Sequence, residues 1–197
     1  MLTLFHAPAS PSSRVIWLLE ELHADYRLEI VSYPRNDGSN VDPRNPHPHG
    51  YTPALEHDGA LVTETGAIAL YLTDLYPRSS IGIPVGDPSR SRYVTWLFYQ
   101  VGLAEPLFYM KGTRVLETDL AMSRLYEAMM SNVEKTLAQG PFILGERFTA
   151  VDILYMSLFE RARELLGKPD WIESYVARGL ARPARQRASA LCHDDPG

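Results

Sequence analysis

Candidate ligand-binding side chains are concentrated in the segment between Pro48 and Ile68. Glu64 and Thr65 stand where a helix is expected to begin, and they bring a carboxylate and a hydroxyl to the free backbone N–H groups of its first turn. Those N–H groups favour an anion, whereas a carboxylate favours an ammonium group. Because the α-amino acid end of a peptide carries both charges, this pair is suited to hold one.

Thr52 precedes a proline and is therefore pushed toward an extended conformation. If the Thr52–Pro53 bond is cis, the backbone N–H and C=O of Thr52 turn outward and can pair with another extended peptide. Only about 5–6% of X–Pro bonds are cis, so these two residues alone leave the isomer open. A group that pairs with a peptide backbone, beside a group that holds an amino acid end, predicts a small peptide ligand.

The elements that must position these groups follow from the hydrophobic pattern. An apolar strand over 2–5, a helix beginning at Ser12 or Ser13, and an alternating strand over 26–31 form a βαβ unit, so the two strands should be parallel. The segment 32–50 is rich in Pro, Asn, Gly and Asp and is predicted to be a long loop. A hairpin with Asp58-Gly59 at its turn then leads to the helix at Glu64.

The second half of the chain shows helical patterns only. A linker rich in Ser, Pro and Gly over 78–88 is followed by helices over 89–109 and 116–137, a buried helix from 148, and one or two helices over 171–190. Thr149 with Asp152 three residues later is a variant of the capping box. We predict an α/β plus all-α architecture, with domains over 1–77 and 89–197 joined by that linker.

Composition excludes several classes of function. The 197 residues carry a net charge of −5, and no block of Lys and Arg suggests a nucleic-acid surface. The apolar N-terminus is too short to span a bilayer and lacks a signal-peptide pattern, so we expect a cytoplasmic protein without a membrane partner. Cys192 is the only cysteine and excludes an internal disulfide; the tail 192–197 is expected to be disordered. The histidines have no metal-site spacing, so no metal is expected.

Two motifs resemble the glutathione S-transferase family. They are Tyr51-Thr52-Pro53-Ala54-Leu55, where the family opens a strand with a cis-proline, and Glu64-Thr65-Gly66-Ala67-Ile68, where an acidic–hydroxyl pair opens a helix. The capping box at 148–152 and the late helices extend the resemblance over nearly the whole chain; the late-helix matches are Tyr175, Arg178, Arg182, Pro183, Ala184, Arg187 and Ala188. The resemblance implies a thioredoxin-like N-terminal domain, a C-terminal helical bundle and a cis Pro53.

The same resemblance assigns a glutathione site. In that site Thr52 pairs with the cysteinyl backbone of glutathione, and Glu64 together with Thr65 holds its γ-glutamyl end. Relatives often carry a lysine or another polar residue where Tyr51 stands, and a tyrosine cannot supply a positive charge to the glycine end. The residues that could substitute are His49, His47 and Arg14. The predicted glutathione-binding set is Tyr51, Thr52, Pro53, Glu64, Thr65 and His49.

A turn between the first strand and the first helix holds Ser10, Ser12 and Ser13. In the family a tyrosine, serine or cysteine at this turn activates the thiol; here Phe5 and His6 occupy the place of the tyrosine, which implies a serine-type site. A hydroxyl or helix N–H that donates to a thiolate lowers the thiol pKa, and the thiolate is the nucleophile. Ser10 fits serine-type relatives best, with Ser12 and Ser13 as alternatives, and one of the serines is expected to cap the helix.

The resemblance therefore implies a glutathione transferase that uses glutathione as co-substrate and attacks a small hydrophobic electrophile, as a homodimer. In the family the first long helix of the second domain faces the electrophile, so Tyr99, Phe108 and Tyr109 are predicted to line its pocket. Two alternatives stay open. One is a glutathione-dependent isomerase, dehalogenase, ether-cleaving enzyme or peroxidase on the same fold; the other is a non-catalytic binding or regulatory module.

Overall fold

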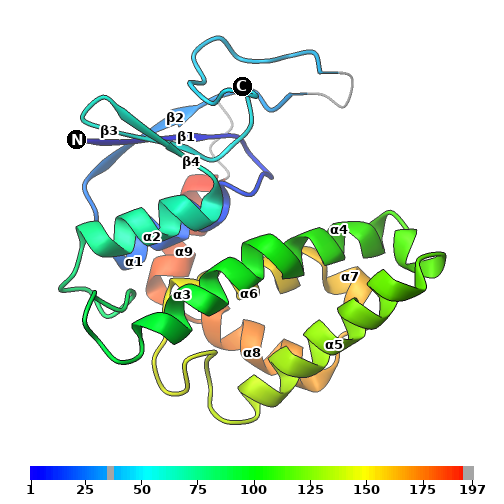
Figure 1. The fold of residues 1–197 in the computed structure, drawn as a ribbon. Helices are drawn as coiled ribbons and strands as arrows, with labels where there is room; N and C mark the ends of the chain where they lie inside the picture. Colours follow the sequence, from blue (N-terminus) through cyan, green and yellow to red (C-terminus); the bar gives the residue numbers. More distant parts are fainter. Residues whose placement is uncertain (35–37, 193–197) are drawn as a thin grey trace. The chain divides into compact units, whose positions relative to one another are not determined.

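A computed structural model describes residues 1–34 and 38–192. The chain divides into two compact units: Met1–Tyr76 together with the residues from Arg182 onward, and Pro77–Ala181 (Figure 1). The predicted linker at 78–88 lies at the start of the second unit. Of the tail for which we expected disorder, 193–197 lie outside the described residues, whereas Cys192 is the last residue of a helix.

The first unit is built on a mixed sheet of four strands. They are β1 (Leu2–His6), β2 (Tyr26–Ile30), β3 (Ala54–His57) and β4 (Ala60–Thr63), in the order β2-β1-β3-β4. β1 and β2 are parallel, as the βαβ pattern predicts, and β3 is antiparallel to both β1 and β4. Asp58 and Gly59 both have positive φ, 50° and 83°, which fits the tight turn of a two-residue hairpin.

Three helices complete the first unit: α1 (Ser13–Glu21), α2 (Thr65–Leu75) and α9 (Pro183–Cys192). They lie on the same side of the sheet in Figure 1. α1 packs against both α2 and α9, and α2 packs against β4. The buried side chains at this core include Leu4, Ile16, Leu19, Leu55, Ile68 and Leu72. The thioredoxin-like arrangement expected for the N-terminal domain is confirmed.

The sequence pattern placed α9 in the all-α domain, but the structure groups it with the first unit. Arg182 forms two hydrogen bonds to Glu21 of α1, at 2.5 and 2.8 Å, and Arg187 bonds Glu20 at 2.7 Å. The Arg185 guanidinium lies 5.6 Å from the ring centre of Trp17. These contacts join residues more than 160 positions apart, so no local pattern could have reported them.

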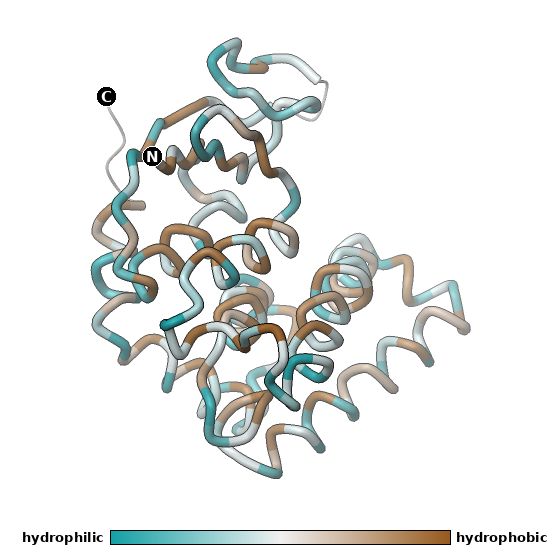
Figure 2. The backbone as a smooth tube through the Cα atoms, turned by 60° about the vertical axis from the view of Figure 1, so that its left-hand side comes forward, coloured by the Kyte–Doolittle hydropathy of each residue, from teal (hydrophilic) through white to brown (hydrophobic). Residues whose placement is uncertain are grey.

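The second unit is helical, as expected. Its helices are α3 (Arg90–Tyr99), a π-helical segment (Gln100–Ala104), α4 (Glu105–Gly112), a short 3-10 helix (Val115–Glu117), α5 (Leu120–Leu137), α6 (Ala150–Arg161), α7 (Arg163–Leu166) and α8 (Asp170–Leu180). In Figure 2 hydrophobic and hydrophilic positions alternate every few residues along the helices, as they do when one face is buried. Over 1–34 and 38–192, no helix combines the length and apolar character needed to cross a membrane.

The capping box predicted at the start of α6 is confirmed. Asp152 accepts a hydrogen bond from the backbone N–H of Thr149 at 2.8 Å and one from its hydroxyl at 3.2 Å. The other carboxylate oxygen accepts from Ile143 N–H and from the hydroxyl of Tyr175 in α8. One buried carboxylate therefore joins the turn before α6, the helix itself and α8.

Candidate functional site in the first unit

A chain of hydrogen bonds runs through the turn between β1 and α1. Ser12 Oγ lies 2.6 Å from His6 Nδ1 and 2.6 Å from Ser10 Oγ. Ser10 Oγ in turn lies 2.9 Å from Thr52 Oγ1, a residue 42 positions away that directly precedes Pro53. The serine turn and the proline turn are therefore in direct contact through the Ser10 hydroxyl.

The expectation that a serine side chain caps α1 is wrong. Ser12 occupies the N-cap position, but its hydroxyl makes no cap hydrogen bond because it turns back to His6 and Ser10. Backbone carbonyls of the turn serve the first N–H groups instead: Ser13 N–H bonds Ser10 O at 3.3 Å, and Arg14 N–H bonds Pro11 O at 3.4 Å. Since these N–H groups already have partners, a hydroxyl is the better donor for a ligand at this turn.

Burial separates the three serines. Ser12 is fully buried and its oxygen also accepts a hydrogen bond from Ala7 N–H, so it faces protein on every side. Ser13 is half-buried and donates its hydroxyl to the carbonyl of Ser10 at 3.1 Å. Ser10 keeps 9% of its surface exposed and has a hydroxyl that can rotate. Of the three candidates, Ser10 is the best placed to touch a ligand.

The Thr52–Pro53 peptide bond is cis, as the resemblance implied. Thr52 is buried to 4% exposure, and neither of its backbone polar groups forms a hydrogen bond within the described residues. β3 begins two residues later, at Ala54. The geometry leaves a peptide N–H and C=O beside Ser10 with their hydrogen-bonding capacity unused.

The start of α2 carries an unusual backbone. Glu64, at the N-cap position, has φ 67° and ψ 121°, and no side chain caps the helix. A non-glycine residue in such a region costs about 1–3 kcal/mol and persists only where the surroundings hold it, often at functional sites. Glu64 is exposed and Thr65 half-buried. A carboxylate, a hydroxyl and uncapped helix N–H groups thus lie together, as the sequence predicted.

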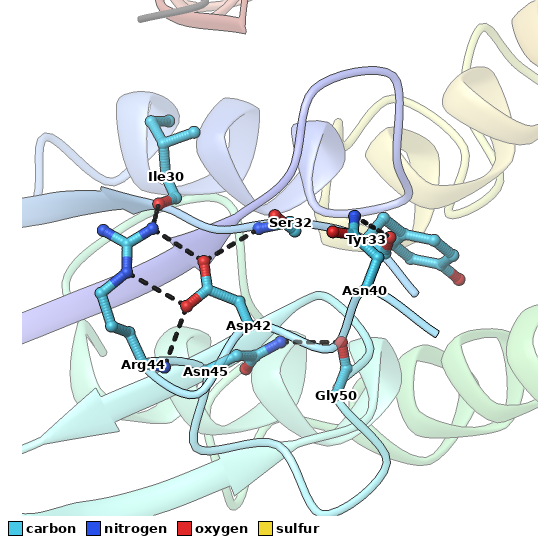
Figure 3. Close-up of polar contacts among 8 residues, drawn as sticks. All are labelled: Ile30, Ser32, Tyr33, Asn40, Asp42, Arg44, Asn45 and Gly50. Carbon is cyan, nitrogen blue, oxygen red and sulfur yellow. Dashed lines mark hydrogen bonds and ion pairs between the residues drawn. The ribbon is translucent and has the colours of Figure 1, made fainter. Parts of the chain in front are cut away.

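The segment before the proline turn is held in place by polar side chains (Figure 3). Asp42 accepts hydrogen bonds from Ser32 N–H, from Arg44 N–H and from the Arg44 guanidinium, which also donates to the carbonyl of Ile30 at the end of β2. The hydrogen bonds from Arg44 hold the pKa of Asp42 well below its usual range. Asn45 donates to the carbonyls of Gly50 and Tyr51 at 2.9 and 3.0 Å.

The loop that these bonds hold in place, residues 38–51, is the anchored loop, and it presents a group of aromatic rings. Tyr51 stacks on Tyr33 with ring centres 5.7 Å apart, and His47 and His49 lie 6.0 and 6.3 Å from the Tyr51 ring. His47 is buried, and burial lowers its pKa while the charge of Glu64 acts in the opposite direction. His49 and Tyr51 are exposed, whereas Arg14 is only 2% exposed. Of the three substitutes considered for a basic residue, His49 is therefore the accessible one.

Comparison with known proteins identifies this arrangement. Residues 4–80 match the family model described as "Glutathione S-transferase, N-terminal domain". The chain is 29% identical over 195 residues to glutathione S-transferase GstA of Escherichia coli O157:H7, which covers 94% of this chain and 96% of that protein. The crystal structure of a glutathione S-transferase from Actinobacillus pleuropneumoniae superposes with a TM-score of 0.80 at 26% identity, over 98% of this chain and 93% of that one. The chain belongs to the glutathione S-transferase family.

Family membership extends along both units. Protein LigF of Sphingobium sp. is 41% identical over 169 residues, which cover 70% of this chain and 62% of that protein. Sequence and fold agree, and they make this chain a glutathione S-transferase-like enzyme. The fold expected from the resemblance, a thioredoxin-like domain with a helical C-terminal region, is the fold observed.

The predicted electrophile-pocket residues do not all lie together. Phe108 and Tyr109 of this transferase line a cavity of about 460 Å³ within the second unit, where Phe108 is buried and Tyr109 is 73% exposed. An ion pair between Arg161 and Glu105, 2.7 Å long, borders the same cavity. Tyr99 is not part of its lining and instead packs edge-on against Trp96, with ring centres 5.2 Å apart.

Sequence reasoning missed the residues that hold the site in shape. The sequence marks His6 only as a residue in the place of a tyrosine, and it marks Asp42, Arg44 and Asn45 only as members of the long loop over 32–50. The sequence does hold one signal for this segment: Asp and Asn side chains in a loop, such as Asp42 and Asn45, often form hydrogen bonds with nearby backbone groups. In the described ranges, 1–34 and 38–192, no group of three or more His, Cys, Asp or Glu side chains is arranged to hold a metal ion.

Proposed function

We propose that this protein is a glutathione transferase, with glutathione as co-substrate and Ser10 as the residue that activates its thiol. The observation that carries the proposal is the 2.9 Å contact between the Ser10 and Thr52 hydroxyls. Thr52 is the residue expected to pair with the cysteinyl backbone of glutathione, so a cysteinyl side chain held there extends toward a neighbouring hydroxyl. Family membership supports the same co-substrate.

Glutathione binds in this proposal along three features of the first unit. The backbone of Thr52 pairs with the cysteinyl residue beside Pro53. The start of α2, with Glu64 and Thr65, takes the charged γ-glutamyl end, its carboxylate by the uncapped N–H groups and its ammonium by the Glu64 side chain. The glycine end lies toward the anchored loop, where His49 and the Tyr51 hydroxyl supply hydrogen bonds in place of a lysine.

The chemical task of Ser10 is to favour the thiolate. A cysteine thiol has an ordinary pKa near 8.5, so most of it is protonated at neutral pH. Lowering that pKa by about 2 units corresponds to about 2.7 kcal/mol of preferential stabilisation of the thiolate. A hydrogen bond to a charged acceptor contributes an amount of that order. The thiolate then attacks the electrophile directly, and no covalent bond to the protein forms.

Calorimetric titration with glutathione, together with the ultraviolet absorbance of the bound thiolate as pH is varied, tests the proposal. We expect micromolar to low-millimolar binding by the wild type and a bound thiol pKa about 2 units below that of free glutathione. Ser10→Ala should bind with similar affinity but raise the thiol pKa, while Ser13→Ala should change neither. No detectable binding by the folded wild type would contradict the proposed function, and an unchanged thiol pKa in Ser10→Ala would contradict the role of Ser10.

The electrophile is proposed to be small and apolar, in contact with Phe108 and Tyr109. Turnover assays with aryl halides, peroxides, halogenated alkanes and aryl ethers separate the transferase reaction from peroxidase, dehalogenase and ether-cleaving chemistry on the same fold. A non-catalytic binding module would bind glutathione weakly or not at all and turn over none of these. Tyr109→Ala should raise KM for the electrophile without changing the glutathione Kd.

We further propose that the protein is a cytoplasmic homodimer, as the family resemblance implies. Sedimentation equilibrium of the purified chain should give twice its monomer mass at micromolar concentration. A monomer that still binds glutathione would leave the catalytic proposal intact and contradict the dimer.

A further inference from the structure

His6 is a buried histidine that the proposed mechanism does not use. It ends β1, has no exposed surface, and places Nδ1 2.6 Å from Ser12 Oγ. Its other ring nitrogen, Nε2, is buried without a hydrogen-bond partner among the described residues. Burial lowers the pKa of His6 to about 4, so the ring is neutral near pH 7 and carries a single N–H. That N–H lies on either Nδ1 or Nε2.

The hydrogen bonds of Ser12 link the choice of tautomer to Ser10. A serine hydroxyl has one proton to donate and two lone pairs to accept with. Ser12 Oγ accepts from Ala7 N–H, and it contacts His6 and Ser10. If His6 Nδ1–H donates to Ser12, then Ser12 donates its proton to Ser10. If Nδ1 is unprotonated, Ser12 donates to His6, and the Ser10 proton must be used to bond Ser12.

The buried Nε2 decides between these two arrangements. With the proton on Nε2, a buried N–H has no acceptor among the described residues, and orphaned buried N–H groups are rare in native structures. With the proton on Nδ1, that N–H has an acceptor at 2.6 Å, and only a lone pair is left without a partner. The Nδ1–H tautomer therefore gives both the His6 N–H and the Ser12 hydroxyl an acceptor.

We propose that His6 is a positioning residue, which as the Nδ1–H tautomer directs the Ser12 hydroxyl toward Ser10 and so leaves the Ser10 proton for the sulfur of glutathione. The inference rests on the proposed function and deepens it. In the free protein the Ser10 proton can point to Thr52 Oγ1, 2.9 Å away. When glutathione binds, the Ser10 hydroxyl rotates to the thiolate, while Ser10 Oγ keeps accepting from the hydroxyl and the backbone N–H of Ser12.

The tautomer can be tested without glutathione. Nitrogen-15 NMR of the histidine rings distinguishes a protonated Nδ1 from a protonated Nε2, and loss of a signal in His6→Asn assigns His6 among the six histidines. We expect a protonated Nδ1 and an unprotonated Nε2 at pH 7, with no titration of this ring down to about pH 5. A protonated Nε2 would overturn the inference and leave the proposed function untouched.

The effect on the thiol is tested with matched variants. His6→Leu removes the donor, whereas His6→Asn places an amide N–H near the position of Nδ1. We expect His6→Leu and Ser12→Ala each to raise the pKa of bound glutathione by about 1 unit, a tenfold loss of thiolate below that pKa, with the glutathione Kd within about threefold of the wild type. His6→Asn should restore most of the lower pKa. His57→Leu, which removes another histidine bonded to a hydroxyl, that of Tyr71 at 2.7 Å, should not change it.

The results for these variants distinguish the positioning role of His6 from the proposed transferase function. If the wild type lowers the thiol pKa, Ser10→Ala abolishes the effect, and folded His6→Leu leaves it unchanged, the positioning role is overturned while the transferase proposal stands. If the wild type neither binds glutathione nor lowers its thiol pKa, the proposed function fails and the role of His6 fails with it. Failure of His6→Asn to rescue would contradict the hydrogen-bond donor as the cause.

Discussion

The two units of this transferase each contain a buried polar network, and the two networks differ in kind. In the second unit, four hydrogen bonds converge on the Asp152 carboxylate: two from backbone N–H groups, one from Thr149 Oγ1 and one from Tyr175 Oη. An ionised carboxylate only accepts, so every donor is assigned. In the first unit, His6, Ser12, Ser10 and Thr52 form a chain whose hydroxyls can each donate or accept.

Under the proposed function, that difference separates a structural network from a catalytic one. The Asp152 network is fully satisfied and joins three segments of the second unit, so it stabilises a single arrangement. In the serine network the Ser10 hydroxyl can turn from Thr52 to another acceptor, and Ser10 is slightly exposed. A hydroxyl can change its hydrogen-bond partner at little cost, so Ser10 is suited to exchange a protein partner for a ligand. Stability should then depend mainly on the Asp152 network, and activation of the thiol mainly on the serine network.

Asp152→Ala should have the largest effect on stability. It leaves three or four buried donors without an acceptor, and removing one partner of a buried charged network costs about 3–5 kcal/mol. Urea unfolding followed by circular dichroism measures the loss. Asp119→Ala, which removes an exposed N-cap of α5, is the control and should cost about 1 kcal/mol. Equal losses in the two variants would show that the Asp152 network has no special structural role.

Acidification should act on the two networks in opposite directions. Burial lowers the pKa of His6 from 6.5 to about 4, so its contribution is complete above pH 6.5 and is lost as pH falls toward 4. Burial raises the pKa of Asp152 from 3.8 to about 6, so the native state binds its proton more tightly, and stability from this group falls as pH rises from 4 to 6.

Unfolding free energies of the wild type, His6→Leu and Asp152→Asn between pH 4 and pH 7 measure these slopes. Relative to the wild type, His6→Leu should lose less stability on acidification, and Asp152→Asn should lose more. Parallel curves for all three proteins would contradict the assignment of these buried groups.

Thr149→Val removes one hydroxyl from the structural network while keeping the shape of the side chain. Because the Asp152 carboxylate loses one of its four donors and α6 loses part of its cap, we expect a destabilisation of about 1–2 kcal/mol. Binding of glutathione to the folded variant should be unchanged in calorimetry. A loss of binding without a loss of stability would assign this threonine to function instead.

Thr52→Val makes the same change in the serine network and should have the smallest effect on stability. We expect a loss below about 1 kcal/mol, since Ser10 keeps Ser12 as a partner. The bound thiol pKa should stay close to that of the wild type, because Ser10 keeps its proton for the sulfur and keeps both of its donors from Ser12. Absorbance titration of bound glutathione measures this pKa. If Thr52→Val destabilised the protein as much as Thr149→Val, the proposed contrast between the networks would disappear.

Much of this architecture could be predicted because its signals are local. The βαβ unit, the hairpin at Asp58-Gly59, the start of α2 at Thr65 and the capping box at Thr149 each depend on residues within a few positions of one another. The cis bond at Pro53 came from the resemblance and not from the residues themselves. The candidate set at the serine turn was likewise local, and the resemblance placed Ser10 first among its members.

The sequence alone identified the residue types that can bind or activate a ligand, whereas the tertiary structure fixed the contacts that each of them makes. Whether Ser12 caps α1 or bonds His6 depends on where the end of β1 lies relative to the helix, and the Ser10 contact to Thr52 joins positions 42 residues apart. The grouping of α9 with α1 depends on Arg182 meeting Glu21 across 161 positions. A hydrogen bond requires placement within a few tenths of an ångström, and only the folded chain fixes distances that small between residues so far apart in sequence.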